Sequence, residues 1–389
     1  MNGLGRRAFA ALLAAMLVVL GARMAHAVTF TIINNDSAGE GFNDNTAASP
    51  VGGNTGTTIG QQRLIAFQYA ADLWGARIDS DIAIRVNASF DALSCNQFGA
   101  VLGQAGPARV NRDFSGAVVA NTWYAAVLAN TLADSDLEPT QPEISASFNS
   151  NLGKLNCLTG TFFYYGLDGN DGLNLDFVTV LTHELGHGLG FLSFIDCPTG
   201  QLFAGFSDAY TNFLEDHSTG DLFPDMTNNE RANACVDGTQ TTSGLHWTGP
   251  IAIAEGADLT SGRHASGHLL MYAPNPLEQG SSVSHWAKVL TPNAMMEPSF
   301  TTSLHNVEID LALLEDTGYP NLFACGDATQ DGNRTATDAL FALNTSVGLS
   351  TCIETLCDIN GTGTTTATDA LGILNFAVGL GSELECGLT

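Results

Sequence analysis

The stretch Asp176–Phe191, with the sequence DFVTVLTHELGHGLGF, gives the strongest indication of the fold. It contains His183 and His187 in the pattern His-Glu-x-x-His. On an α-helix these histidines lie one turn apart on the same face, so both imidazoles can bind one metal ion. Zn²⁺ is the usual ion for nitrogen ligands, and we therefore expect this helix to carry two ligands of a zinc site.

Glu184 follows the first histidine and lies close enough to reach a water molecule on the metal. A bound metal ion lowers the pKa of water from about 16 to about 7, and a carboxylate can then take its proton. The alternative is that both histidines are core residues of a buried helix, but the helical context favours a metal site. A catalytic zinc site usually has three protein ligands, so we expect a third elsewhere in the chain.

The flanks of the motif predict the bounds and the packing of the helix. Asn174 or Asp176 can cap its start, and Gly190 can end it. Glycine costs about 1 kcal/mol relative to alanine in a helix interior, so Gly186 and Gly188 indicate a close approach by another part of the chain. The apolar residues expected to pack inward are Phe177, Val180, Leu181, Leu185 and Leu189.

The chain has 389 residues and a formal net charge of -27, and its only lysines are Lys154 and Lys288. A surface of this charge repels phosphate backbones and anionic lipids, which argues against nucleic acid as a partner. It suits an extracellular protein and divalent cations. The length is sufficient for two or three domains.

Met1–Ala27 has the features of a secretory signal peptide, with two arginines before the apolar run Ala8–Leu20 and a cleavage pattern at Ala25-His26-Ala27. The alternative is an uncleaved membrane anchor, for which the run is short. No later segment is apolar enough to cross a bilayer, so we expect a secreted, extracellular protein, free or associated with the cell surface. Export favours disulfide bonds. Four of the eight cysteines precede residue 320 and four follow it, which fits pairing within each part and leaves the connectivity open.

Hydrophobic periodicity predicts an α+β domain in which helices cover a sheet. Apolar residues recur at helical spacing in Gln61–Ile78 and alternate as in a strand in Asp81–Phe90. One face of Glu143–Asn149 is serine and asparagine, which suits an edge strand. Leu102–Ser115 is expected to be a loop, and the long segment after Gly190 shows little periodicity. Further strands are expected at Thr29–Ile33 and Phe162–Tyr165, and further helices at Ala120–Leu132, Phe203–Glu215 and Glu308–Thr317.

The third ligand does not follow directly from the motif. His-Glu-x-x-His-x-x-Gly opens the metzincin signature, whose short form has a histidine three residues after the glycine, but that position is Ser193. Glu215 is the nearest candidate for a glutamate on a second helix, as in thermolysin-like enzymes, and no supporting pattern surrounds it. His285 is the strongest candidate. The other downstream histidines, which fit loop or packing roles better, are His246, His264, His268 and His305.

Three features late in this region resemble the leishmanolysins, a metzincin family in which a long insertion delays the third histidine. They are the segment Ser284-His285-Trp286, the methionine Met296, and the closing sequence LHNVEIDLALLEDTGYP at 304–320. The resemblance covers roughly Leu64–Tyr319 and is strongest at the metal-binding helix and after residue 284.

The resemblance implies a metzincin-type zinc metallopeptidase domain at 28–322, with a cleft between subdomains at 28–190 and 191–322. The implied zinc ligands are His183, His187 and His285. Met296, or Met295 after a one-residue shift, would form the Met-turn beneath the imidazoles without binding zinc. The implied substrate is a protein or peptide, bound in extended form along the expected edge strand.

The implied mechanism is hydrolysis by a zinc-activated water, with Glu184 as the general base that passes the proton to the leaving amine. The group that stabilises the oxyanion stays open among Tyr272, His305 and Tyr319. The alternative function is a non-catalytic extracellular adhesion or binding protein that keeps a metzincin-like shell. Such a shell does not require Glu184, so the enzyme is favoured. A glycan-processing enzyme is a third possibility, for which we find no suitable pair of carboxylates.

Residues 323–389 form a separate module with an internal repeat, because the sequence at 326–349 is matched 31 residues later and TATDAL occurs in both copies. Each copy has an acidic loop followed by an apolar helix. The loops resemble those of dockerins, which implies Ca²⁺ binding and a cohesin-like or surface partner. The expected Ca²⁺ ligands are Asp327, Asp331 and Asp338 in the first loop, and Asp358, Asn360 and Asp369 in the second. Threonines at 329 and 362 replace better ligands, and the alternative is a helix pair held by disulfides without metal.

Overall fold

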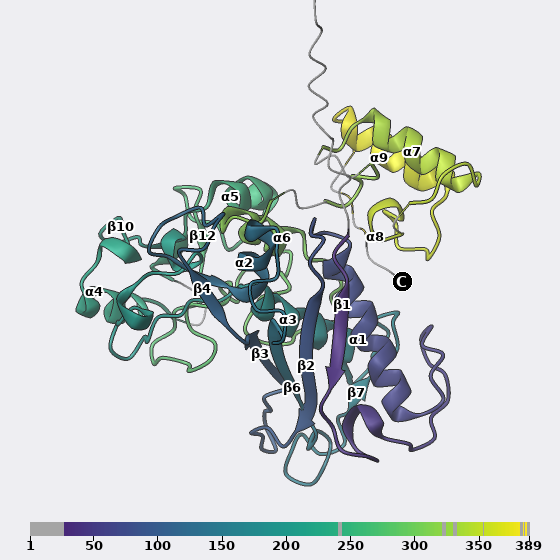
Figure 1. Ribbon diagram of the computed structural model, residues 1–389, viewed down its shortest axis with the longest axis horizontal. Helices are drawn as coiled ribbons and strands as arrows, with labels where there is room; N and C mark the ends of the chain where they lie inside the picture. The colour runs from purple at the N-terminus through teal and green to yellow at the C-terminus, as the bar shows by residue number, and fades with distance from the viewer. Residues whose placement is uncertain are drawn as a thin grey trace, which may run out of the picture.

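The computed structural model describes residues 27–239, 243–320, 324–329, 333–352, 354–381, 384 and 386. The predicted signal segment before Ala27, and Asp331, lie outside these residues. Within them the chain is mixed α/β, with helices packed on sheets, which is compatible with the expected α+β class. Figure 1 shows the first sheet and its helices together and the C-terminal helices as a separate group.

The first sheet has the strand order β1-β2-β6-β3. Its strands are β1 (Phe30–Asn34), β2 (Ile84–Asp91), β6 (Ile144–Asn149) and β3 (Gly103–Pro107). The first three are parallel to one another, and β3 pairs antiparallel with β6. Every second residue of β2 is buried, as the alternation of apolar residues in the sequence predicts.

Two long helices, α1 (Ile59–Gly75) and α3 (Phe177–Leu189), pack against each other and against strands of this sheet. Their apolar residues recur at helical spacing, so each helix has one face that must be buried. The fully buried Trp74 of α1 donates its indole N–H to the carbonyl of Thr182 in α3 at 2.9 Å. The aromatic residues that fill the core between helices and strands are Phe42, Phe67, Phe90, Phe148, Phe163 and Phe177.

The edge of the first sheet differs from the prediction. The strand predicted at Glu143–Asn149 is not an edge strand, because β2 and β3 pair with it on both sides. Ser147 and Asn149 are buried, and the Asn149 side chain donates to the carbonyl of Val101 at 2.7 Å. Glycine and proline lower strand propensity, so the sequence GQAGP of β3 resembles a loop. An edge strand tolerates Pro107, since one side of the strand needs no N–H donor.

The segment after Gly190 is more ordered than its sequence indicates. It forms a second sheet, antiparallel throughout, with the order β10-β9-β11-β12. These strands are β10 (Asp221–Leu222), β9 (Leu214–Asp216), β11 (Leu245–Trp247) and β12 (Leu269–Leu270). The helix predicted over Phe203–Glu215 is wrong. Two 3-10 turns, η2 (Phe203–Gly205) and η3 (Thr211–Phe213), precede β9 instead.

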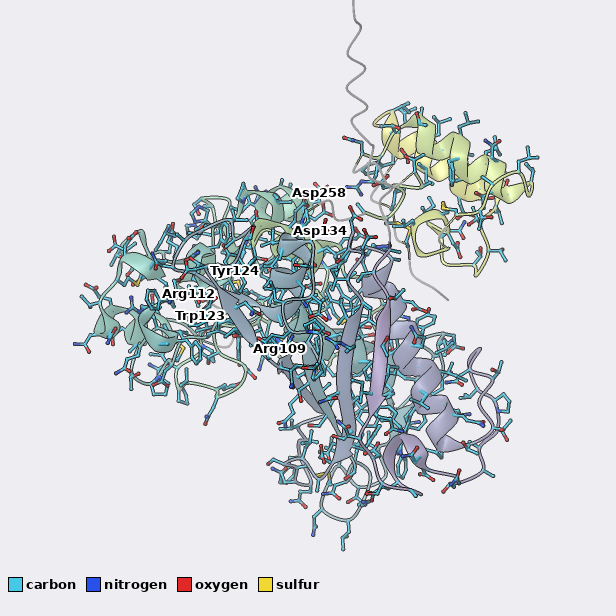
Figure 2. All side chains as sticks on the ribbon, in the orientation of Figure 1. Arg109, Arg112, Trp123, Tyr124, Asp134 and Asp258 are labelled. Atoms are coloured by element: carbon cyan, nitrogen blue, oxygen red, sulfur yellow. A yellow bond between two sulfur atoms is a disulfide. The ribbon has the colours of Figure 1, made fainter. Side chains whose placement is uncertain are left out.

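A short antiparallel pair, β4 (Val110–Arg112) and β5 (Trp123–Ala125), precedes α2 (Ala126–Ala133), so the helix predicted from Ala120 begins later than expected. The Arg112 guanidinium lies 5.2 Å from the centre of the Trp123 ring, and Figure 2 shows the two residues together. The other elements of this region are η1 (Gly41–Asn43), β7 (Phe163–Tyr164), β8 (Leu175–Asp176), η4 (Phe223–Asp225), α4 (Asn228–Ala234), α5 (Pro250–Glu255), η5 (Gly256–Asp258) and α6 (Glu308–Asp316).

The eight cysteines form four disulfide bonds, and none joins the part before residue 320 to the part after it, as predicted. The bonds are Cys95–Cys157, Cys197–Cys235, Cys325–Cys386 and Cys352–Cys357. The C-terminal helices α7 (Ala336–Ser346), α8 (Glu354–Cys357) and α9 (Ala367–Ala377) belong to a second, smaller core. Within the described ranges, no helix combines the length and the apolar character that a membrane span requires.

Candidate metal centre

Helix α3 carries the His-Glu-x-x-His motif and is fixed at both ends. Asp176 caps its start, where one carboxylate oxygen accepts hydrogen bonds from the N–H of Thr179 at 2.8 Å and from its hydroxyl at 2.6 Å. Gly190 ends the helix with a φ of 117°, a left-handed conformation that favours glycine. Both ends agree with the sequence prediction, which left the cap open between Asn174 and Asp176.

Three imidazoles meet beside this helix. The Nε2 atom of His285 lies 3.1 Å from Nε2 of His183 and 3.1 Å from Nε2 of His187. His285 follows β12, in the segment that ends the long excursion after α3. Tetrahedral ligands about 2.0–2.1 Å from a zinc-like ion are about 3.3 Å apart, so the three nitrogens fit around one ion. The structure thus brings together the three residues that the sequence analysis selected as ligands.

Backbone carbonyls fix the tautomer of all three rings. The Nδ1 atoms of His183, His187 and His285 lie 2.9, 2.8 and 2.8 Å from the carbonyl oxygens of Met295, Phe191 and Ser281. A carbonyl can only accept, so each Nδ1 carries the proton and each Nε2 presents its lone pair to the shared point. Burial lowers the pKa of His187 to about 3 and also lowers those of His183 and His285. The rings are therefore neutral, which is the form that binds metal.

Glu184 lies between α3 and the edge strand β3. Its carboxylate is buried, and burial raises its pKa to about 8, although the backbone N–H of Ala105 donates to it. A Cβ atom on Gly103 would stand 2.8 Å from the Glu184 Cγ, so only glycine allows the strand this close. Glu184 is thus held next to the three imidazoles and faces the same cleft.

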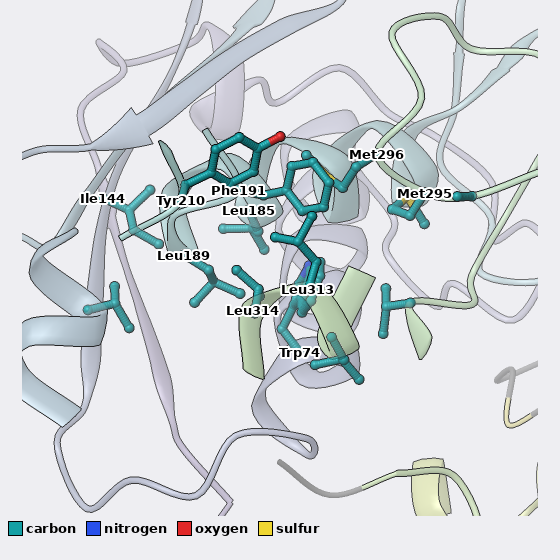
Figure 3. Close-up of a cluster of buried hydrophobic side chains, with 14 of the residues drawn as sticks. Trp74, Ile144, Leu185, Leu189, Phe191, Tyr210, Met295, Met296, Leu313 and Leu314 are labelled. Carbon is teal, nitrogen blue, oxygen red and sulfur yellow. The ribbon is translucent and has the colours of Figure 1, made fainter. Parts of the chain in front are cut away.

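Met296 packs beneath the motif. A Cβ atom on Gly186 would stand 2.5 Å from the Met296 sulfur, which explains the glycine predicted to permit a close approach. Gly188 has the same role toward β6, since a Cβ there would stand 2.6 Å from Cγ2 of Ile144. Figure 3 shows Met296 with Trp74, Leu185 and the residues around them. The neighbouring Met295 has a different role, because its carbonyl accepts from His183.

Asp310 of α6 positions this region, and the sequence analysis did not select it. Its carboxylate accepts the Trp286 indole N–H at 2.8 Å and the backbone N–H groups of Met295 and Met296 at 3.2 Å each. It therefore ties Trp286, the residue next to His285, to the backbone of Met295 and Met296. Burial raises the pKa of Asp310 to about 7. A signal was present, since Asp310 shares its helix face with Leu313 and Leu314, and a carboxylate on a buried face is unusual.

A cavity of about 1050 Å³ opens over the centre. Its lining includes residues of β3, residues of the segments 277–285 and 293–304, the three imidazoles and Glu184. The cleft runs between residues of the two predicted subdomains.

None of the three oxyanion candidates lines this cleft. The Tyr319 hydroxyl donates to the carbonyl of Leu189 at 2.7 Å, and His305 pairs with Asp176 through Nε2 and Oδ2 at 2.9 Å. Tyr272 is fully buried, with the Lys288 ammonium 4.8 Å from the centre of its ring. These residues have packing roles in the structure.

The loops of the C-terminal module contain buried carboxylates. Asp327, Asp338, Asp358 and Asp369 are each buried, whereas Asn360 is exposed and Asp331 lies outside the described residues. Asp338 accepts from the N–H of Thr329 at 2.9 Å, and one oxygen of Asp369 has no partner. Among the residues that the structure describes, these loops do not bring three acidic or histidine ligands within 4.8 Å of one another.

The chemistry of the main centre follows from its donor set. Three neutral imidazole nitrogens and a nearby carboxylate suit a divalent metal ion of the first transition row with one position left open. Comparison of the chain with models of protein families, with curated proteins and with solved structures finds no match.

Proposed function

We propose that this chain is a secreted, zinc-dependent endopeptidase of the leishmanolysin-like metzincin type. The observation that carries the proposal is the convergence of three Nε2 atoms, each on a ring fixed by a backbone carbonyl, beside the buried carboxylate of Glu184. Three protein ligands leave one coordination position for substrate or water, which distinguishes catalytic from structural zinc sites.

Zinc, when bound, supplies a Lewis acid that polarises the scissile carbonyl and acidifies water. His183, His187 and His285 hold it as neutral ligands. A cation on the three imidazoles would lower the pKa of Glu184 and keep its carboxylate ionised. The carboxylate would then take a proton from the attacking water and deliver it to the leaving amine. Glu184 lines the same cavity as the three imidazoles, where a scissile carbonyl would be held.

The peptide substrate binds along β3, which replaces the strand first expected in this role. β3 pairs with β6 on one side only, so its other side has backbone groups free of the sheet. The backbone N–H of Ala105 points to Glu184, which places this free side at the base of the cleft. An extended peptide that adds to an edge strand in this way presents its carbonyls beside the centre.

The test is metal content and casein cleavage for the wild type, Glu184→Gln and His285→Ala. We expect the wild type to bind about one zinc ion per chain at this centre and His285→Ala to lose it. Glu184→Gln should keep the zinc ion, but its cleavage of casein should be lowered about 10³-fold or more. If Glu184→Gln cleaves casein as fast as the wild type, Glu184 is not the general base and the proposed mechanism is wrong. Zinc binding without any cleavage by the wild type favours the alternative, a non-catalytic extracellular binding protein.

The C-terminal module supports a second part of the proposal, a docking or attachment role. The two repeats expose apolar side chains at matching positions 31 residues apart: Leu340, Leu343 and Val347 on the first helix, and Leu371, Leu374 and Val378 on the second. Exposed apolar side chains that recur on a small module mark a protein-binding face. We propose a dockerin-like module with Ca²⁺ in its loops and a cohesin-like or surface partner.

A further inference from the structure

The second sheet carries a group of metal-ligating side chains that the proposed peptidase does not use. One ligand atom from each of Glu215, His217, His246 and His268 lies within 4.8 Å of all the others. His264 adds a further ring, whose centre is 4.1 Å from that of His217. The sequence analysis considered several of these residues only as ligands of the first centre, and the structure places them together at a different one.

The strands of the sheet determine this convergence. Glu215 on β9 is the register partner of His246 on β11, so the two side chains share one face of the sheet. His217 follows Glu215 by two residues and continues on that face. His268 directly precedes β12, whose Leu270 is the other register partner of His246. Three adjacent strands therefore supply the four side chains.

Glu215 holds two of the histidines at ligand spacing. Its Oε1 atom lies 3.1 Å from Nδ1 of His217 and 3.2 Å from Nδ1 of His268. These are the separations of neighbouring ligands around a tetrahedral ion, which are about 3.3 Å. The side chain of Glu215 is 12% exposed, so the carboxylate faces these rings rather than solvent.

His246 provides an independent observation, because it has a buried nitrogen without a partner. The residue is 1% exposed, and its Nε2 lies 3.2 Å from the carbonyl oxygen of Ser243. The carbonyl can only accept, so the proton resides on Nε2 and Nδ1 keeps a lone pair. That Nδ1 atom is buried and has no hydrogen-bond partner. A buried acceptor without a partner is costly, and a cation on Nδ1 removes the cost.

We propose that Glu215, His217, His246 and His268 bind one divalent metal ion of the zinc type. Three nitrogens and one carboxylate oxygen complete a tetrahedral shell and leave no open position, so the site is structural rather than catalytic. It joins β9, β11 and the start of β12. The chain continues from β12 to Met271, which pairs with Trp286, the residue after His285. The second ion thus braces the sheet that supports the third ligand of the first centre, whether or not that centre is a peptidase.

The test is zinc analysis of the full chain after ZnCl₂ is added and free metal is removed. The wild type is expected to hold about two zinc ions per chain, and His183→Ala/His187→Ala about one. His246→Ala/His268→Ala is also expected to hold about one, while His264→Ala, a neighbouring histidine whose Nδ1 is bonded to Ser266, keeps about two.

If His246→Ala/His268→Ala fails to fold, the proposal can still be tested on His183→Ala/His187→Ala, which lacks the first centre. In that chain, added ZnCl₂ should raise the temperature of unfolding, and Co²⁺ in its place should give the intense visible absorption of tetrahedral coordination. Two results overturn the second site. The first is that His183→Ala/His187→Ala binds no zinc. The second is that the wild type binds one zinc ion and His246→Ala/His268→Ala still binds one. Neither result bears on peptide cleavage, so the two proposals fail separately.

Discussion

At the scale of single residues, Gly188 shows how the motif depends on what packs against it. An alanine Cβ there would stand 2.6 Å from Cγ2 of Ile144, a β-branched side chain with little freedom to move. We expect Gly188→Ala to lower the free energy of unfolding by about 1–3 kcal/mol, although alanine favours helices by about 1 kcal/mol. Urea titration measures the change. Gly99→Ala is the control, since a Cβ at Gly99 meets nothing within 4 Å. If Gly188→Ala and Gly99→Ala are equally stable, the close packing of Gly188 against Ile144 is contradicted.

Asp208 gives a pH dependence with a definite sign. The carboxylate accepts hydrogen bonds from Phe194 and Thr211, but burial raises its pKa from 3.8 to about 6. The folded chain then binds the proton more tightly than the unfolded chain does. This contribution to stability is complete below about pH 4 and is lost as the pH rises through about 6. The stability of the wild type relative to Asp208→Asn should therefore fall by roughly 3 kcal/mol between pH 4 and pH 7. If the difference in stability between the wild type and Asp208→Asn does not vary with pH, the raised pKa of Asp208 is contradicted.

The sequence predicted the centre unevenly at this scale. His183, Glu184 and His187 follow from local spacing on one helix, and His285 and Met296 required a family resemblance. Asp310 and the second histidine cluster were not predicted. Asp310 reaches its partners, 14 to 24 residues earlier in the chain, through the packing of α6. Only the paired strands bring the histidines of the cluster together.

At the scale of elements, the long ones were predicted, whereas most of the short ones were not. Helices α1, α3 and α6 and strand β2 have enough residues to show a period. Strands β9, β11 and β12 have two or three residues each and no period to detect. β3 was missed because Gly103, which leaves room for Glu184, and Gly106 both weaken its strand signal. The glycine that the site requires thus makes β3, the strand proposed to bind the substrate, difficult to predict from the sequence.

The repeated C-terminal loop–helix units carry a prediction about calcium. Asp338 and Asp369 close capping boxes at the starts of α7 and α9, and both are buried. If a cation shares these carboxylates, CaCl₂ at about 100 times its dissociation constant should stabilise the module by about 2.7 kcal/mol. Calorimetry of the full chain with CaCl₂ and with EGTA measures the shift of the module's transition. Asp338→Ala/Asp369→Ala should abolish the response. A transition unchanged by calcium leaves the helix pair without metal.

At the scale of the whole molecule, the buried apolar residues of the described chain fall into two separate clusters. The buried residues of 28–319 form one hydrophobic cluster, and those of the C-terminal module form another around Ala342 and Ile373. The sequence predicts a boundary near residue 323, because an internal repeat begins there. The cleft could not be described from the sequence alone, because the segments that line it lie far apart in the chain.

The net charge of -27 acts on the whole molecule and carries the last prediction. Repulsion among excess carboxylates destabilises the compact state, and its range falls from about 30 Å at 0.01 M salt to about 8 Å at 0.15 M. The chain should therefore unfold at a temperature about 2–4 °C higher in 0.15 M NaCl, the shift that corresponds to about 1 kcal/mol. Differential scanning calorimetry with zinc and calcium held constant measures it. Choline chloride at equal ionic strength should give the same shift, because the effect is one of screening. A lower unfolding temperature in salt would mean that attractive ion pairs, such as those of Arg85 with Asp136 and Glu143, outweigh the repulsion.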